Sequence, residues 1–375
     1  MTFITKNDMP THLTSWQKAQ AAMLYHFTSA EYLIGLHKMV GDLLNGFVDP
    51  LLEAAKAQGR DNVLFSETWG ERNFSSNWEN NAWPFLRDLQ ISIATSIARR
   101  QAKQFSVTAV NESLRGVAEY STDWTTPGEE RLLNLALATI SEYAAPHDKS
   151  VEIYQNKWND YRFAYVYRAF ARLMLKVPKF QVRAEVSGFS GEVPPQTGVY
   201  MSVDDPHASL QFVWSEPAGP KIRTSNTFNE IGLAALSFVG RQSLWFDEAK
   251  MFEFATAKPY AERFRDSVFL YGEPYPSLAP AAVARSAFKS RPCQWALVDI
   301  VPGEFEGPDL FHEPEVVQSE VHNRIAGGEL CTKEGYYFTP SMPGTRRYFA
   351  IAETAPNLSS SYGKTYWQWD ANQEQ

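Results

Sequence analysis

This 375-residue chain has only two cysteines and no long apolar run. Cys293 and Cys331 are too few for a disulfide framework or a four-thiolate zinc site, so we expect both to be buried thiols. No stretch approaches the roughly 18 apolar residues that a helix needs to cross a bilayer. Residues 1–10 are polar and lack the basic start and apolar core of a secretory signal. These absences predict a cytoplasmic protein that does not act on a membrane.

The sequence also lacks the motifs of well-known catalytic and cofactor sites. None of the seven histidines lies in a metal or triad motif. Gly327-Gly328 lacks the lysine and the strand-to-helix setting of a phosphate loop, and the segment 188–191 is one residue too short for a nucleophile elbow. We interpret these glycines as turn residues. We therefore predict a protein that is not an enzyme and has no catalytic residue, cofactor or metal.

Positive charge is scarce in the second half of the chain. Residues 1–177 carry 18 Lys/Arg and 19 Asp/Glu, whereas residues 178–375 carry 17 and 24, which is a net charge of -7 out of the total of -8. A negative field argues against nucleic acid as a ligand and favours a basic partner, if the partner is charged. Plain solubility is the competing explanation.

A short pattern occurs twice, at a constant offset of 137 residues, and six of its 22 aligned positions are identical. The identical residues are Gly191, Glu192, Gly198, Tyr200, Pro206 and Phe212 in the first copy, and Gly328, Glu329, Gly335, Tyr337, Pro343 and Phe349 in the second. Alternating apolar residues on either side of a proline-containing turn predict a hairpin in each copy. Neither copy holds a set of residues that could do chemistry, so the repeat indicates a binding scaffold.

The hydrophobic periodicity changes at Val177-Pro178. Before this point, apolar residues at helical spacing predict helices, and after it alternating residues predict strands with short helices between them. The expected helices of the first half are 14–40, 47–57, 80–103, one that opens at Thr126 and ends before Pro146, and a long one over 149–176. In the second half, Thr227 to Glu230 has the spacing of a capping box. We predict an α+β fold, with an all-helical bundle domain over 1–177 and a mixed domain over 178–375 that contains hairpin repeats at 191–214 and 328–352.

The run from Asp299 to Glu320 is acidic and contains no Lys or Arg. Prolines within it imply an extended surface path, and its spacing matches no calcium loop. It is interpreted as a solvated loop, as an acidic docking surface for a basic protein, or as a cation site around His312. The candidate partner-binding residues in this run are Glu304, Glu306, Asp309, Glu313 and Glu315.

Two tryptophans near the C-terminus, Trp367 and Trp369, face the same side of a predicted strand. We interpret them as core residues, with the alternative that one of them anchors a partner. Large aromatics are abundant here, with 11 Trp, 17 Tyr and 24 Phe, and such residues dominate both cores and interfaces.

The second copy and its tail resemble the C-terminal signature of bacterial polymorphic-toxin immunity proteins, in the families numbered seventy-one and seventy-two. The resemblance is strong over about 45 residues and is carried by Gly328-Glu329-Leu330-Cys331, Gly335 to Pro340, Thr345 to Phe349, Tyr362-Gly363 and Tyr366 to Asp370. Thr332 departs from the pattern, since a proline usually follows the cysteine. The resemblance implies a protein made beside a toxin, often one delivered by contact-dependent or type VI secretion, which it neutralises by binding. It implies no catalytic residue.

We therefore expect an immunity protein that occludes its cognate toxin domain stoichiometrically. Two alternatives remain open at this point. One is a chaperone or adaptor that loads a secreted effector, and the other is an enzyme that reverses the toxin's modification of its target. The sequence sets neither the toxin's identity nor the oligomeric state.

Overall fold

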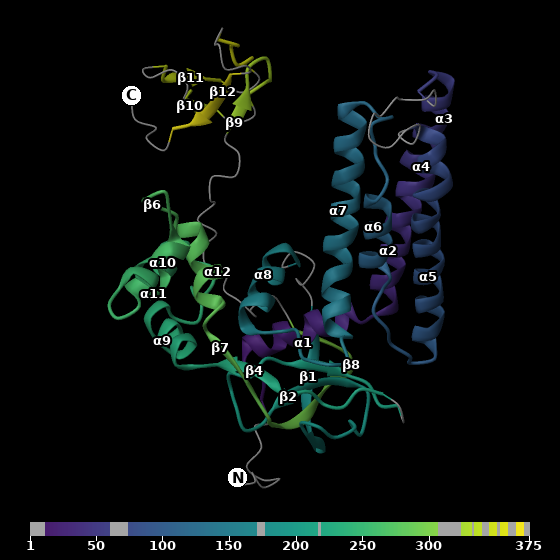
Figure 1. The fold of residues 1–375 in the computed structure, drawn as a ribbon. Coiled ribbons are helices and arrows are strands. Elements are labelled where there is room, and N and C mark those ends of the chain that lie inside the picture. Colours follow the sequence, from purple (N-terminus) through teal and green to yellow (C-terminus); the bar gives the residue numbers. More distant parts are fainter. Residues whose placement is uncertain are drawn as a thin grey trace. The chain divides into compact units, whose positions relative to one another are not determined.

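The computed structural model describes residues 12–60, 74–170, 177–216, 219–306, 324–331, 334–339, 345–350, 353–358 and 365–370 (Figure 1). The chain divides into two compact units, Met1–Phe311 and His312–Gln375. The fold class is α+β, as predicted, with helices first and antiparallel sheets after them. The domain boundary expected at 177/178 lies inside the first unit, where helices and strands share one core.

The first part of the chain is helical. Its helices are α1 (Ser15–Phe27), α2 (Ala30–Leu43), the π-helical turn η1 (Leu44–Val48), α3 (Asp49–Ala57), α4 (Ser75–Asn81), α5 (Trp83–Gln101), α6 (Val110–Ala118), α7 (Pro127–Ser150) and α8 (Asp160–Phe170). Capping boxes open α1 at Thr14 and α7 at Thr126. The helix expected over 14–40 is two helices, because Ser29 caps α2 by accepting a hydrogen bond from the Tyr32 N–H.

Two further helix predictions are wrong around residue 150. Helix α7 does not end before Pro146 but includes it and continues to Ser150. The single helix expected over 149–176 does not form, since the chain leaves the helix after Ser150 and α8 begins only at Asp160. Side-chain oxygens of Asn156 and Asn159 accept hydrogen bonds from nearby backbone N–H groups and hold this connection in a non-helical path.

The helices belong to two different cores. Helices α2 to α7 pack side by side around one core that includes Leu36, Leu86 and Ile140 (Figure 1). Helices α1 and α8 instead share a core with the strands, which includes Phe27 and Val199. The expected helical bundle therefore exists without α1, whose apolar face is needed to cover the sheet.

Strands and short helices follow. They are β1 (Val177–Phe189), β2 (Gly198–Ser202), β3 (Gln211–Val213), β4 (Ser225–Phe228), α9 (Glu230–Val239), α10 (Glu248–Thr256), α11 (Ala261–Val268), β5 (Phe269–Leu270), β6 (Glu273–Pro274), η3 (Pro276–Leu278), α12 (Ala279–Ala284), β7 (Phe288–Arg291) and β8 (Gln294–Glu306). The capping box expected from Thr227 is wrong. Thr227 lies in β4 and donates to Asp205, while Asn229 caps α9.

The second unit repeats the sheet of the first. Its strands are β9 (Arg324–Ala326), β10 (Gly335–Phe338), β11 (Arg347–Phe349) and β12 (Tyr366–Trp369). The strand order is β1-β8-β2-β3 in the first unit and β9-β12-β10-β11 in the second, and every pairing is antiparallel. In each sheet a later strand inserts between the first strand and a hairpin. The 137-residue repeat thus marks a duplicated four-stranded sheet.

The two copies also share one turn, at residues 137 positions apart. Gly191 has φ +97° and Gly328 has φ +92°, a conformation that glycine adopts at least cost. The carboxylates of Glu192 and Glu329 each accept a hydrogen bond from the backbone N–H three residues earlier, at 2.8 and 3.2 Å. The shared Gly-Glu pair is therefore turn chemistry.

Candidate functional site

The acidic residues predicted to bind a partner are only partly described. Glu304 and Glu306 lie near the end of β8, and each is paired with a lysine. Lys179 Nζ lies 2.7 Å from Glu304 Oε2, and Lys18 Nζ lies 2.5 Å from Glu306 Oε2. These lysines offset the negative charge at this position. The other predicted residues lie outside the described residues, and they are Asp309, Glu313 and Glu315.

The two predicted tryptophans lie in the core of the second sheet. Trp367 is 3% exposed, its Nε1 donates to the Pro356 carbonyl at 2.8 Å, and its ring packs edge-on against Phe349. Trp369 is half-buried and packs edge-on against Tyr337 with ring centroids 5.2 Å apart. Their structural role matches the core interpretation. Cys293 and Cys331 are also buried, and neither forms a disulfide among the described residues.

One buried carboxylate is a structural link. Asp160 is 4% exposed and accepts hydrogen bonds from Trp16 Nε1 and Trp245 Nε1, both at 2.7 Å. Arg241 adds a bidentate contact through Nη1 and Nη2 at 2.9 and 2.7 Å. Four donor groups saturate this carboxylate, so it ties α1 and α8 to the segment before α10.

His147 is the most deeply buried titratable group that could have served as a base. Its Nδ1 lies 2.8 Å from the Phe27 carbonyl oxygen and its Nε2 lies 3.2 Å from that of Ser106. Burial lowers the pKa of His147 to about 4. The ring lies between these two backbone segments, and as a neutral imidazole it donates to one of the two carbonyl oxygens. In the described ranges, moreover, no three His, Cys, Asp or Glu side chains gather as metal ligands would.

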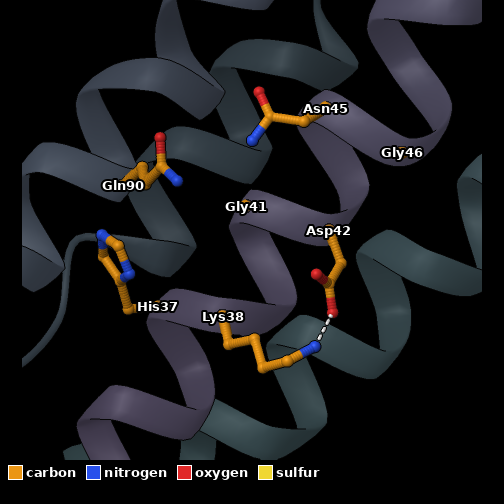
Figure 2. A pocket seen from close by; sticks show the side chains of 7 residues that line it. All are labelled: His37, Lys38, Gly41, Asp42, Asn45, Gly46 and Gln90. Atoms are coloured by element: carbon orange, nitrogen blue, oxygen red, sulfur yellow. Dashed lines mark hydrogen bonds and ion pairs between the residues drawn. The ribbon is translucent and has the colours of Figure 1, made fainter.

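A hollow opens on the helical bundle where α2 and η1 face α5 (Figure 2). Its volume is about 680 Å³. The residues that line it are His37, Lys38, Gly41, Asp42, Asn45, Gly46 and Gln90. Lys38 Nζ and Asp42 Oδ2 form an exposed ion pair at 2.6 Å along its rim.

A second hollow, of about 700 Å³, shares only Asn45 with the first. Asn45 lies in the π-helical turn, and together we call the two hollows the bundle groove. The second hollow is lined by Asn45, Asp49, Pro50, Leu52, Glu53, Glu79, Asn80, Trp83 and Pro84. The second hollow therefore lies where η1 and α3 face α4 and the start of α5.

Two glycines keep the first hollow open. A Cβ on Gly46, in the middle of η1, would meet no atom within 4 Å, so its side chain would project into open space. A Cβ on Gly41 would lie 2.9 Å from Gln90 Nε2. Glycine inside a helix costs stability relative to alanine, and π-helical turns often occur at functional sites. Sequence reasoning missed this groove, although two glycines five residues apart inside a helical pattern were a signal.

Gln90 is the residue of α5 that lines the first hollow. Its side chain is 9% exposed, and its Oε1 accepts from Arg87 Nη1 at 2.5 Å. Within the described part of the chain, Gln90 Nε2 has no acceptor, and it faces Gly41 (Figure 2).

The second hollow is acidic. Asp49 Oδ1 accepts from Trp83 Nε1 at 2.8 Å, which fixes this carboxylate against the indole. Glu53 and Glu79 both approach Lys56 Nζ, at 3.3 and 3.0 Å. Three carboxylates thus line this hollow, and two of them, Glu53 and Glu79, share the ammonium group of Lys56, which lies outside its lining.

Comparisons with known proteins found no relative of this chain. No family model, no curated protein and no solved structure matches it. As for the helices that the described ranges contain, none is both long enough and apolar enough to traverse a bilayer.

Proposed function

We propose that this chain is a cytoplasmic immunity protein that binds one secreted bacterial toxin domain in a 1:1 complex. The bound immunity protein blocks the toxin's active site or substrate channel by steric occlusion. Such a function requires a rigid surface and no catalytic group of its own, since the inhibitor only has to outcompete the substrate. Large buried aromatics and a duplicated sheet supply the rigidity.

The observation that carries this proposal is that the signature residues within the described ranges belong to one folded sheet. Tyr337, Phe349 and Trp367 share its buried core, and Arg346 pairs with Asp370 at 2.6 Å. The positive-φ Gly328 and its neighbour Glu329 make its first turn. The residues that resemble the immunity families are therefore interdependent parts of one structural unit, which supports an interpretation of the resemblance as more than shared composition.

Co-expression with the product of the adjacent reading frame tests the proposal. We expect this chain to restore growth to cells that express the toxin domain, and to elute with it as a 1:1 complex in gel filtration. An effector-loading adaptor would bind the toxin and leave it lethal. An enzyme that reverses the toxin's modification would protect at substoichiometric amounts without a stable complex. Either of these results would overturn the proposal.

A further inference from the structure

Each of the two four-stranded sheets has two faces, and strand pairing shows which residues correspond between the copies. One face of each sheet holds a core that contains the tryptophan of the inserted strand, Trp295 in the first sheet and Trp367 in the second. Because successive residues of a strand point to opposite faces, the neighbouring positions form the other face. On this other face lie Val199, Met201 and Phe212 in the first sheet and, at the corresponding positions of the second, Tyr336, Phe338 and Tyr348.

In the first sheet, helix α1 covers this face. The three residues there are at most 3% exposed and share a core with apolar side chains of α1. Polar side chains of the helix also reach the strands. Gln20 Oε1 accepts a hydrogen bond from the Leu210 N–H at 3.0 Å, and the Tyr25 hydroxyl donates to the Val298 carbonyl at 2.6 Å. The chain itself therefore shows that this face of the sheet is suited to an amphipathic helix.

In the second sheet, the same face is an exposed aromatic surface. Tyr348 is 47% exposed, and Tyr336 and Phe338 are partly exposed. The rings of Tyr336 and Tyr348 pack edge-on with centroids 5.3 Å apart, and the Arg346 guanidinium lies 4.0 Å from the centre of the Tyr336 ring. The described residues of this unit include no helix. The water-facing side of an antiparallel sheet ordinarily carries polar residues, whereas aromatic residues beside an arginine are the composition of interface hot spots.

We infer that this outer face, formed by Tyr336, Phe338 and Tyr348, binds an amphipathic helix of the toxin domain as the first sheet binds α1. This inference rests on the proposed function and adds the surface and the secondary structure of the bound segment. Tyrosine hydroxyl groups need hydrogen-bond partners once they are covered, so the helix carries polar side chains beside its apolar stripe, as α1 does. Arg346 already pairs with Asp370 at 2.6 Å, so the outer face sets no sign for the charge of the helix.

A double substitution tests the outer face. Tyr336→Ala/Tyr348→Ala removes two rings from this face and does not touch the core on the other side of the sheet. The matched control is Leu330→Ala, which removes a 59% exposed apolar side chain from the same unit. The probe is the catalytically inactivated toxin domain of the adjacent reading frame, with Kd measured by calorimetry and folding checked by thermal melting. We expect the double variant to raise Kd by at least about 30-fold, the loss typical of a hot spot, and Leu330→Ala to leave Kd unchanged.

Two further measurements use the chain with its sheet intact. In hydroxyl-radical footprinting of the wild-type chain, we expect Tyr336, Phe338 and Tyr348 to be oxidised when the chain is free and severalfold less in the complex, with Leu330 oxidised equally in both. Benzoylphenylalanine in place of Tyr348 then identifies the bound element by photo-cross-linking. We expect cross-links to toxin residues three or four positions apart, which is the spacing of one helix face, whereas a strand would give a spacing of two.

The outcomes separate the two proposals. A tight complex whose Kd is unchanged in Tyr336→Ala/Tyr348→Ala overturns the outer face as the docking surface and leaves the immunity function standing. Equal oxidation of its three aromatics in the free chain and the complex does the same, and this result decides if melting shows the double variant to be unfolded. Cross-links at a spacing of two overturn the helix. Failure of the wild-type chain to bind the toxin domain at all overturns the immunity function, and the assignment of the outer face with it.

Discussion

In the first unit, strand β2 is buried at all five of its positions, whereas the equivalent strand β10 of the second unit alternates between buried and half-buried positions. Helix α1 packs on the first sheet, and Tyr25 of this helix donates to the Val298 carbonyl at 2.6 Å. The described residues of the second unit contain no helix. The same strand order therefore occurs in a sheet covered by α1 and in a sheet whose described residues include no helix.

The two hairpins also differ in register. Gly198 pairs with Val213, which is 15 positions later (213 − 198), and Gly335 pairs with Phe349, which is 14 positions later (349 − 335). The connection in the second copy is thus one residue shorter. A shift by one residue moves side chains to the opposite face of a strand. Tyr348 accordingly lies opposite Tyr336, in the place that Phe212 holds opposite Val199.

The inserted strands carry equivalent tryptophans. Trp295 in β8 pairs with Gly188, and Trp367 in β12 pairs with Ile325, and these partners are again 137 residues apart. The tryptophans themselves are only 72 residues apart (367 − 295). The first copy therefore has 65 additional residues (137 − 72). One lies in the connection between β2 and β3, and the other 64 lie between β3 and β8 and include α9 to α12. The inserted strand thus has the same register against the first strand in both sheets.

Removing these tryptophans should lower the free energy of unfolding more than any other change to the two sheets considered below. Trp295→Ala and Trp367→Ala should each cost about 3–5 kcal/mol in free energy of unfolding, because both indoles are buried and both donate a hydrogen bond. Amide hydrogen exchange by mass spectrometry would localise the loss. We expect Trp367→Ala to raise exchange over 324–370 and leave the first unit protected, and Trp295→Ala to raise exchange in the first unit.

The control for this pair is Tyr154→Ala, since Tyr154 is 86% exposed and should change stability by less than about 0.5 kcal/mol. Equal loss of protection in both units after Trp367→Ala would contradict the independence of the second sheet.

The local parts of this architecture could be predicted and the non-local parts could not. The helix start at Thr126, the hairpins and the change from helices to strands all depend on residues a few positions apart. The pairing of β8 with β1 and of β12 with β9 joins residues 40 to 129 positions apart along the chain (366 − 326 and 306 − 177), for which a single sequence holds no signal. The groove combines Gly41 with Gln90 from a different helix, so only its glycines were visible in advance.

The first unit should differ from the second in its response to acid. The folded pKa of His147 is about 4, below its ordinary 6.5, so its contribution to stability is complete above pH 6.5 and is lost as pH falls towards 4. Burial raises the pKa of Asp148 from 3.8 to about 6, and this group has the opposite effect over nearly the same range. The two neighbours therefore offset each other in the wild-type chain.

In the Asp148→Asn variant, the pH dependence of stability that His147 contributes should no longer be offset. We expect the free energy of unfolding of the first unit to fall by about 3 kcal/mol between pH 6.5 and 4, from a pKa difference of roughly two and a half units. Denaturant melts across this pH range would measure it, with exchange in the second unit as an internal reference. The double variant His147→Gln/Asp148→Asn should lose the slope, and a slope that survives would assign it to another group.

Substitutions in the two Gly-Glu turns should have smaller effects on stability, and the effects should be similar in the two units. Gly191→Ala and Gly328→Ala should each cost about 1–2 kcal/mol, because both positions have positive φ where alanine is strained. Gly46→Ala is the control of opposite sign. Its site is helical and open, so the change should stabilise the first unit by about 0.5–1 kcal/mol. Thermal melts of the three variants would check the signs, and a tolerated Gly328→Ala would mean that the second turn relaxes to another conformation.

The smallest expected effect comes from the carboxylates of these turns. Glu192→Ala and Glu329→Ala remove an acceptor from a turn N–H and should cost about 1 kcal/mol, while the Gln variants keep an acceptor and should lose less. The bond of Glu192 is shorter, 2.8 against 3.2 Å, so its variants should lose slightly more. Urea melts that give similar losses in both copies would mean that duplication preserved the turn itself. A loss confined to Glu192 would mean that the second sheet is held by its aromatic core, with the turn only tolerated.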